Sequence, residues 1–600
     1  MPRLERVAAS FFYFKRKLYL CTQITNIMTR NRLRTLLLGS FLSCWTLAAS
    51  AQEEIIEHEG SKYIIHVERL NPDAEMTLLD VLHICPELMS SDGKTLTANF
   101  ILSVDDIFLS ADYEPLLEGI KACDLSEVIV SGYGAVLNAT DGTSGTIDLQ
   151  FKEAEGLAGK LALKGSTYGN GQLYADVVSR SEKVTVRAFA QTKLQYGTAD
   201  ASGNSITSRN AVENAMLFVD WQATDNDLLK LKLSQGYGDR KNRMLDADLY
   251  EETDMIRERW GELVATYERN LNEQEAGLYF EAGMNYTGID LDLLKSRTAQ
   301  PWWIVECSFP FLKQSLWMTA GYEGGYMNLW DKSISREQNL YNDLYVQLDY
   351  KKGPWVISVG DRFRHNNFWD KNYVKGDRSL WSYNRNENAL HASVGYQKGS
   401  HFVQAIFNRS YFNPLASDFQ DYLDDESIHH NTSYKTNLAW RWEGRYTYQT
   451  EHLVATGSVT HTLRTDMLTP NEALTGLGAI VTWHHGPLRL TGGANVYHLH
   501  ISSDEAVDET FFSLKLTPTL LLGNGFRLSS VLIYNSRRDY YGTHAHLNAS
   551  VKMNKDLGKR CNVFADFHDI AGQPSGEWYS LTQSFKNRAL TIGFTYYPWR

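Results

Sequence analysis

The sequence predicts a transmembrane antiparallel β-barrel of about 22 strands with a small α+β plug domain in its lumen. Three observations predict it: an export signal, a compact mixed segment directly after it, and a long series of alternating strands up to the carboxyl terminus. Aromatic residues make up 12% of the 600 residues, including 33 Tyr and 15 Trp. Such a composition is expected of a sheet with one lipid-facing side and one wet side.

The export signal is a basic segment followed by an apolar one. Three arginines between positions 30 and 34 precede an apolar run over 36–47, and small residues end at Ala51. This is the pattern of a signal peptide with cleavage after Ala51. We therefore expect the signal to end at Ala51 and Met28 to be the true start, with residues 1–27 assigned from a start codon placed too early. The alternative is a long amphipathic leader.

Charge and hydropathy narrow the class of the mature chain. The net charge of the full chain is −12, and residues 1–51 hold eight Lys or Arg and one acid, so the mature chain carries −19. We therefore expect no nucleic-acid partner. After Ala51 no apolar run approaches about 18 residues, the length that a spanning helix needs. If the chain lies in a membrane, it must therefore cross it with strands.

Residues 158–600 are predicted to form the barrel. Leu229, Leu231 and Leu233 alternate with polar residues, and similar period-two patterns continue to the end. A soluble sandwich alternates too, so the connections are the stronger argument: short turns and long loops are typical of outer-membrane barrels, in which the short turns face the periplasm. Tight turns are predicted at 225–227, 351–354, 397–400, 485–487 and 523–525, and long polar loops at 196–210, 235–257, 364–380 and 411–434.

Residues 52–157 are predicted to form a periplasmic tail and the plug, because a barrel of this size needs an obstructed lumen. The sequence predicts a strand at 62–67, a helix at 76–88, a strand pair at 98–109, a helix at 112–122, and a strand, glycine-rich turn and strand over 127–149. Cys85 and Cys123 both lie in this segment, and whether they pair is left open.

This segment resembles the plug domain of TonB-dependent receptors, and more closely the receptor-like outer-membrane β-barrel family common in Bacteroidetes. The resemblance rests on Lys62 to Glu68, Thr77 to Leu82 with Pro86, Val104 to Asp106, Asp124 to Val130 and Gly142 to Leu149. The "PGV" and "LRG" motifs of the family are replaced by Pro86-Glu87-Leu88 and by Leu96 to Phe100.

The resemblance implies an outer-membrane receptor or transporter, exported through the inner membrane, that binds a ligand at extracellular loops and admits it past the plug. It implies outer-membrane lipid and a TonB-type energy-coupling protein as partners, with a glycan, metal complex or peptide as ligand. The candidate TonB-coupling segment is Glu54, Ile55, Ile56 and Glu57, and its alternative is a disordered charged tail. The alternative function is a plugged barrel that acts as a surface docking or assembly platform without transport, for example for a surface lipoprotein.

Aromatic and acidic loop residues are the other candidate sites. Aromatic faces among polar groups suit stacking on a sugar, cofactor or peptide, although girdle residues give the same pattern. No spacing predicts a catalytic centre, so we expect neither an enzyme nor a cofactor. The ligand-loop candidates are Trp369, Tyr373, Trp381, Tyr383, Phe419 and Tyr422, and a weak candidate for a divalent metal, or else a solvated acidic loop, is Asp421, Asp424, Asp425, His429 and His430.

Overall fold

The computed structural model describes the plug segment in part and most of the barrel. The described residues are 55–59, 62–70, 72, 76–88, 100–105, 107–109, 120–131, 145–153 and, from 156 to 599, all except 168, 200–204, 246–250, 272–275, 292–293, 332–334, 373–379, 413–436, 466–470, 503–505, 540–543, 569 and 572–588. The predicted signal peptide lies outside them. Among these residues, none of the helices has the length and apolar character needed to cross a bilayer.

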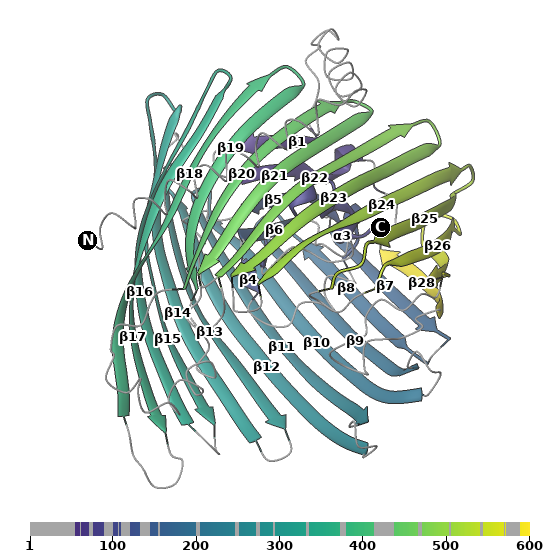
Figure 1. The fold of residues 1–600 in the computed structure, drawn as a ribbon, viewed down its shortest axis with the longest axis horizontal. Helices are drawn as coiled ribbons and strands as arrows, with labels where there is room; N and C mark the ends of the chain where they lie inside the picture. Colours follow the sequence, from purple (N-terminus) through teal and green to yellow (C-terminus); the bar gives the residue numbers. More distant parts are fainter. Residues whose placement is uncertain are drawn as a thin grey trace. The chain divides into compact units, whose positions relative to one another are not determined.

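Twenty-two antiparallel strands, β7 to β28, form a closed barrel in chain order within the described residues, and β28 pairs with β7 to close it (Figure 1). This confirms the predicted strand number. Their bounds are β7 Leu157–Ser166, β8 Gly171–Arg180, β9 Val184–Ala199, β10 Ser205–Thr224, β11 Asp227–Leu245, β12 Glu251–Asn270, β13 Gly277–Leu291, β14 Leu294–Phe311, β15 Leu316–Asp331, β16 Ser335–Lys352, β17 Trp355–Asn372, β18 Leu380–Lys398, β19 His401–Phe412, β20 Asn437–Thr450, β21 Leu453–Thr465, β22 Asn471–His485, β23 Leu488–Ser502, β24 Val507–Leu522, β25 Phe526–Asn535, β26 His546–Asp556, β27 Cys561–His568 and β28 Ala589–Trp599.

Alternation along the strands separates an apolar outer face from a polar inner face. In β11 the side chains of Leu229, Leu231 and Leu233 are exposed on the outside, whereas Lys230 and Lys232 between them are buried on the inside. A closed barrel has no unpaired edge, and its outer apolar face is what lipid requires. The barrel therefore spans a membrane.

The two ends of the barrel differ in their connections. The predicted tight turns are confirmed, and Gly353, Gly399 and Gly486 take positive φ angles of 57–58° in three of them, as two-residue hairpin turns require. The opposite end carries the longest connections, including residues 413–436 and 373–379, and is therefore the extracellular end.

The predicted loop bounds at this extracellular end are wrong. β11 continues to Leu245 and β12 begins at Glu251, where a loop over 235–257 was expected. The expected loops at 196–210 and 364–380 are shortened by strands in the same way. Above the apolar band both faces of the sheet meet water, so alternation fades while the ladder of backbone hydrogen bonds continues.

The plug is a six-stranded mixed sheet in the order β1-β2-β5-β6-β3-β4, in which β3 and β6 are parallel. The expected helix at 76–88 is shorter: its first turn is closed by a capping box between Thr77 and Asp80, and Pro86 begins a separate 3-10 turn. Most of the expected helix at 112–122 lies outside the described residues. The bounds are β1 Ile56–Glu59, β2 Lys62–His66, β3 Phe100–Val104, β4 Ile107–Leu109, β5 Leu125–Ser131, β6 Gly145–Phe151, α3 Leu78–Leu82 and the 3-10 turns Val67–Leu70, Pro86–Leu88 and Ala122–Asp124.

Plug and wall share one hydrophobic core. Plug residues such as Ile65, Val128 and Ile147 are fully buried in a cluster that also contains Phe189 and Phe218 from the inner face of the barrel. Cys85 and Cys123 are thiols and form no disulfide with each other.

Candidate functional site

The candidate site is the contact between the plug and the inner wall of the barrel. Polar contacts to the plug come from strands all around the barrel, which means that the plug obstructs its interior. They join Lys160 of β7 to Asp124, Lys230 of β11 to the Asp105 carbonyl, Lys351 of β16 to Glu57 and Glu59, Thr456 of β21 to the Ile84 carbonyl, and Lys515 of β24 to His83.

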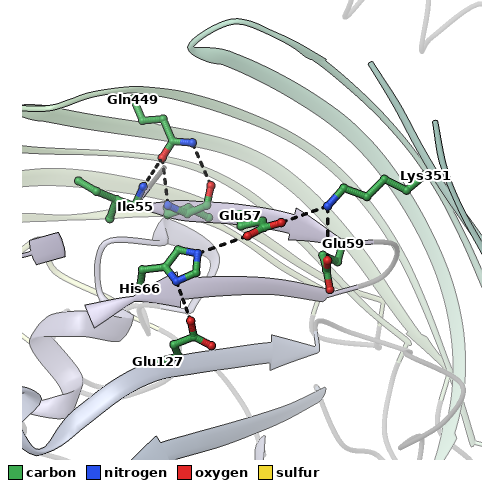
Figure 2. A network of polar contacts seen from close by, with 8 residues as sticks. Ile55, Glu57, Glu59, His66, Glu127, Lys351 and Gln449 are labelled. Atoms are coloured by element: carbon green, nitrogen blue, oxygen red, sulfur yellow. Dashed lines mark hydrogen bonds and ion pairs between the residues drawn. The ribbon is translucent and has the colours of Figure 1, made fainter. Parts of the chain in front are cut away.

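The first plug strand, β1, is held on both edges. On one edge it pairs with β2, and on the other the side chain of Gln449 replaces a neighbouring strand. Gln449 Oε1 accepts hydrogen bonds from the backbone N–H groups of Ile55 at 3.1 Å and Ile56 at 3.0 Å, and its Nε2 donates to the Ile56 carbonyl at 2.9 Å (Figure 2). Both isoleucine side chains are buried.

Charged side chains add a second set of contacts to β1. Lys351 Nζ lies 3.1 Å from a Glu57 carboxylate oxygen and 3.4 Å from one of Glu59. His66 in β2 bridges Glu57 and Glu127, which joins β1 to β5 across the sheet (Figure 2). Although partial burial opposes it, contact with Lys351 and His66 lowers the pKa of the Glu57 carboxyl.

His58 of β1 is buried between the plug and the wall. Its ring stacks on Phe402 of β19 with 3.6 Å between ring centroids and 10° between planes. Its Nε2 has no hydrogen-bond partner among the described residues. Burial, together with the positive charges of Arg445 and Lys351, holds the pKa of the imidazole well below its usual range, so the ring is neutral at neutral pH.

Asp105 follows β3 in a left-handed backbone conformation, with a φ angle of 48°. Its Oδ1 accepts a hydrogen bond from the backbone N–H of Phe151 at 3.1 Å, and Lys230 of the wall donates to its carbonyl at 3.1 Å. Burial raises the pKa of the Asp105 carboxyl to about 7, so this group titrates near neutral pH.

The segment around α3 contacts the opposite part of the wall. Lys515 Nζ donates to His83 Nδ1 at 2.7 Å, and Thr456 Oγ1 donates to the Ile84 carbonyl at 2.6 Å. Burial opposes ionisation of Asp80, but the charge of Lys515 and the hydrogen bonds from Thr77 lower the pKa of its carboxyl. The plug is therefore fixed to the wall by ionised and neutral contacts together.

Some sequence-predicted site residues fall inside strands and others lie outside the described residues. Ile55, Ile56 and Glu57 are in or beside β1, whereas Glu54 is not described. Trp369 belongs to β17, and Trp381 and Tyr383 belong to β18; nothing of their side chains is described. The remaining ligand-loop candidates, Tyr373, Phe419 and Tyr422, and the metal candidates Asp421, Asp424, Asp425, His429 and His430 lie outside the described residues.

Sequence reasoning missed the wall residues that hold the plug. Gln449, Lys351 and Phe402 are each about 300 or more residues from their β1 partners in the chain. They are distinguished only by lying at inward-facing positions of a strand, and many other residues lie at such positions. No local signal in the sequence identifies them.

Searches with family models and among curated proteins found no match to this chain. Solved structures with the same fold include the siderophore receptor PiuA from Acinetobacter baumannii, at a TM-score of 0.70 and 10% identity, covering 92% of this chain and 99% of that one. The copper transporter OprC has a TM-score of 0.71 and 10% identity, and the alignment covers 92% of this chain and 100% of that one. The FrpB iron transporter from Neisseria meningitidis has a TM-score of 0.69 and 11% identity, and the alignment covers 90% of this chain and 100% of that one. The chain thus has the plug-and-barrel fold of TonB-dependent outer-membrane receptors, and its apolar outer face places it in the outer membrane.

Proposed function

We propose that this protein is an outer-membrane receptor that binds a small ligand at its extracellular loops and admits it past the plug. The observation that carries the proposal is the ring of contacts from β7 to β24 that fixes the plug across the interior of a closed barrel. A channel blocked in this way passes solute only when the plug rearranges. In this proposal the protein performs no covalent chemistry.

The ligand class to test first is a metal complex. The structures with the same fold include a siderophore receptor, a copper transporter and an iron transporter. Glycans and peptides are the other two classes that the aromatic loop residues suit, with Trp369, Trp381 and Tyr383 as the first positions to substitute.

The amino-terminal segment is proposed to receive the energy-coupling protein of the TonB type. Because β1 is bound by β2, Gln449 and Lys351, coupling requires that this strand first detach from the wall. The same firm attachment also favours the second candidate function, a docking or assembly platform in which the plug stays closed.

Uptake by whole cells distinguishes the two functions. Cells that depend on the protein would be given radiolabelled ferric chelates, copper, oligosaccharides and peptides, with and without the energised coupling protein. We expect saturable uptake of one class that is lost when the coupling protein is absent or when residues 52–59 are deleted. Absence of uptake for every class, in cells with the protein folded in the outer membrane, contradicts transport. Normal surface assembly after the same deletion supports docking.

A further inference from the structure

The outer wall of the barrel has a hollow of about 340 Å³ near its extracellular end. It lies on β13, β14 and β15, and Tyr286 and Trp330 at its sides are each more than 40% exposed on the face that also carries Met284. This is the lipid-facing side of the wall, opposite to the plug. The hollow is lined by Tyr286, Arg297, Thr298, Ala299, Asn328 and Trp330.

The strand register places this hollow at the border between the apolar band and the polar zone above it. One row of outward residues below it is entirely apolar, with Leu263, Met284 and Pro301 side by side on β12, β13 and β14. The two upper rows carry the charges. The row at the upper edge of the hollow holds Arg259, Gly288, Arg297 and Trp330, and the row above it holds Arg257, Asp290 and Lys295.

Four cations gather in these two upper rows: Arg257, Arg259, Lys295 and Arg297, which we call the basic rim patch. Asp290 is the one acid between them on β13. On β11 the outward residue Asp239 lies directly opposite Arg257, and Glu213 on β10 bounds the patch beyond it. A local excess of positive charge in a chain with a net charge of −12 points to an anionic partner.

One cation of the patch is fixed and the others are available. Arg297 donates to Asp290 Oδ1 at 2.6 Å and to the Ser296 carbonyl at 2.7 Å, and it lies across Gly288, where a Cβ would come within 3.1 Å of its Cδ. Arg257, Arg259 and Lys295 are exposed and make no hydrogen bond or close ion pair within the described part of the chain.

We propose that the basic rim patch and the hollow below it bind a phosphate-bearing lipid of the outer leaflet. The patch lies at the depth of the lipid headgroups, so Arg259 and Lys295 face the phosphates, and Tyr286 and Trp330 flank the neutral part of the headgroup. The acyl chains run down the apolar row of Met284 and Pro301. This inference does not depend on transport and applies equally to a docking platform.

The test is native mass spectrometry of the full-length protein in detergent, titrated with bis-phosphorylated lipid A, with phosphate-free lipid A, or with inorganic pyrophosphate. We expect saturable binding of the phosphorylated lipid only, because the site needs both the phosphates and the chains. Equal binding of the phosphate-free lipid overturns the proposal. So does saturation of the site by free pyrophosphate, which would identify a general anion site instead.

Charge variants locate the site on the wall. Each cation near a membrane surface contributes roughly fivefold in affinity, so the double variant Arg259→Gln and Lys295→Gln is expected to bind phosphorylated lipid A about 25-fold more weakly. The matched control, Arg269→Gln with Lys313→Gln, removes two charges from the periplasmic end of the same region and should leave the affinity unchanged. Asp290→Asn is expected to strengthen binding. Equal affinity in the two double variants, both shown to be folded by heat-modifiable gel mobility, refutes the assignment.

Discussion

The side-chain amide of Gln449 binds Ile56 as a neighbouring strand would, accepting from its backbone N–H at 3.0 Å and donating to its carbonyl at 2.9 Å. An edge strand normally leaves these groups for water or for another chain. Here a residue of the barrel wall occupies them, so any partner that adds a strand to β1 must first displace Gln449.

Replacing Gln449 is expected to loosen β1 without unfolding the barrel. Gln449→Leu leaves buried backbone groups of Ile55 and Ile56 without partners, at a cost of about 1–3 kcal/mol. Amide hydrogen exchange in residues 56–59 should therefore become roughly ten- to a hundredfold faster. Gln449→Glu retains the acceptor but loses the donor, and we expect an intermediate rate. Unchanged exchange in both variants would show that β2 alone holds the strand.

Asp105 is expected to make part of the plug less stable as pH rises. The pKa of the Asp105 carboxyl is about 7 in the folded protein and 3.8 in its usual range. Between pH 3.8 and about 7 the folded state therefore holds a proton on Asp105 that the unfolded state has lost. Stability is therefore greatest below about pH 4 and falls up to about pH 7, by no more than about 1.4 kcal/mol per pH unit.

Hydrogen exchange in β3 and β6, measured from pH 4 to 8 and corrected for the intrinsic rate, tests this prediction. Asp105→Asn is the matched variant, because asparagine tolerates the positive φ angle and keeps the oxygen that accepts from Phe151. It should abolish the pH dependence in this region. If β3 of the wild-type protein is equally protected from hydrogen exchange at pH 4 and at pH 8, the result contradicts a raised pKa of Asp105.

His58 is expected to act in the opposite direction, on β1. Its pKa is lowered in the folded state, so the unfolded segment takes up the proton first as pH falls. The stability that neutral His58 provides is complete above about pH 6.5 and is lost progressively below it. Exchange in residues 56–59 should therefore accelerate at pH 5.

The substitution His58→Phe keeps a flat ring against Phe402 and removes the titrating group. It should make β1 exchange independent of pH between 5 and 7, while the β3 response assigned to Asp105 stays as in the wild type. If both regions lose their pH dependence together, the two groups do not act separately as proposed.

Period-two patterning predicted the strands, because alternation of Leu229 to Leu233 with polar residues is a local property of the chain, and the contrast between short turns and long loops predicted the barrel. Strand ends were not predictable in the same way, since β11 and β12 continue above the lipid, where alternation is no longer required. The contact between Gln449 and Ile56 spans 393 positions and has no local signal. The basic rim patch becomes visible only once the register brings Arg259 and Arg297 to either side of Gly288.

Gly478 on β22 faces the plug at a position where a single added methyl group tests the contact between plug and wall. A Cβ added there would lie 2.9 Å from Pro86 Cβ of the plug and 2.5 Å from Asn495 Oδ1. The asparagine side chain can turn aside, but the proline ring cannot, so Gly478→Ala is expected to push this part of the plug from the wall, at a cost of about 1–3 kcal/mol.

Conductance across planar bilayers measures the consequence. The wild-type protein should be closed to ions, and the Gly478→Ala variant should show small, intermittent openings as the displaced plug leaves a path along β22. Gly444→Ala is the control, because Gly444 lies in the neighbouring part of the wall on the exposed outer face and a Cβ there meets nothing within 4 Å. Equal conductance in the two variants would mean that the plug absorbs the extra methyl group, and that the Pro86 contact does not contribute to the seal.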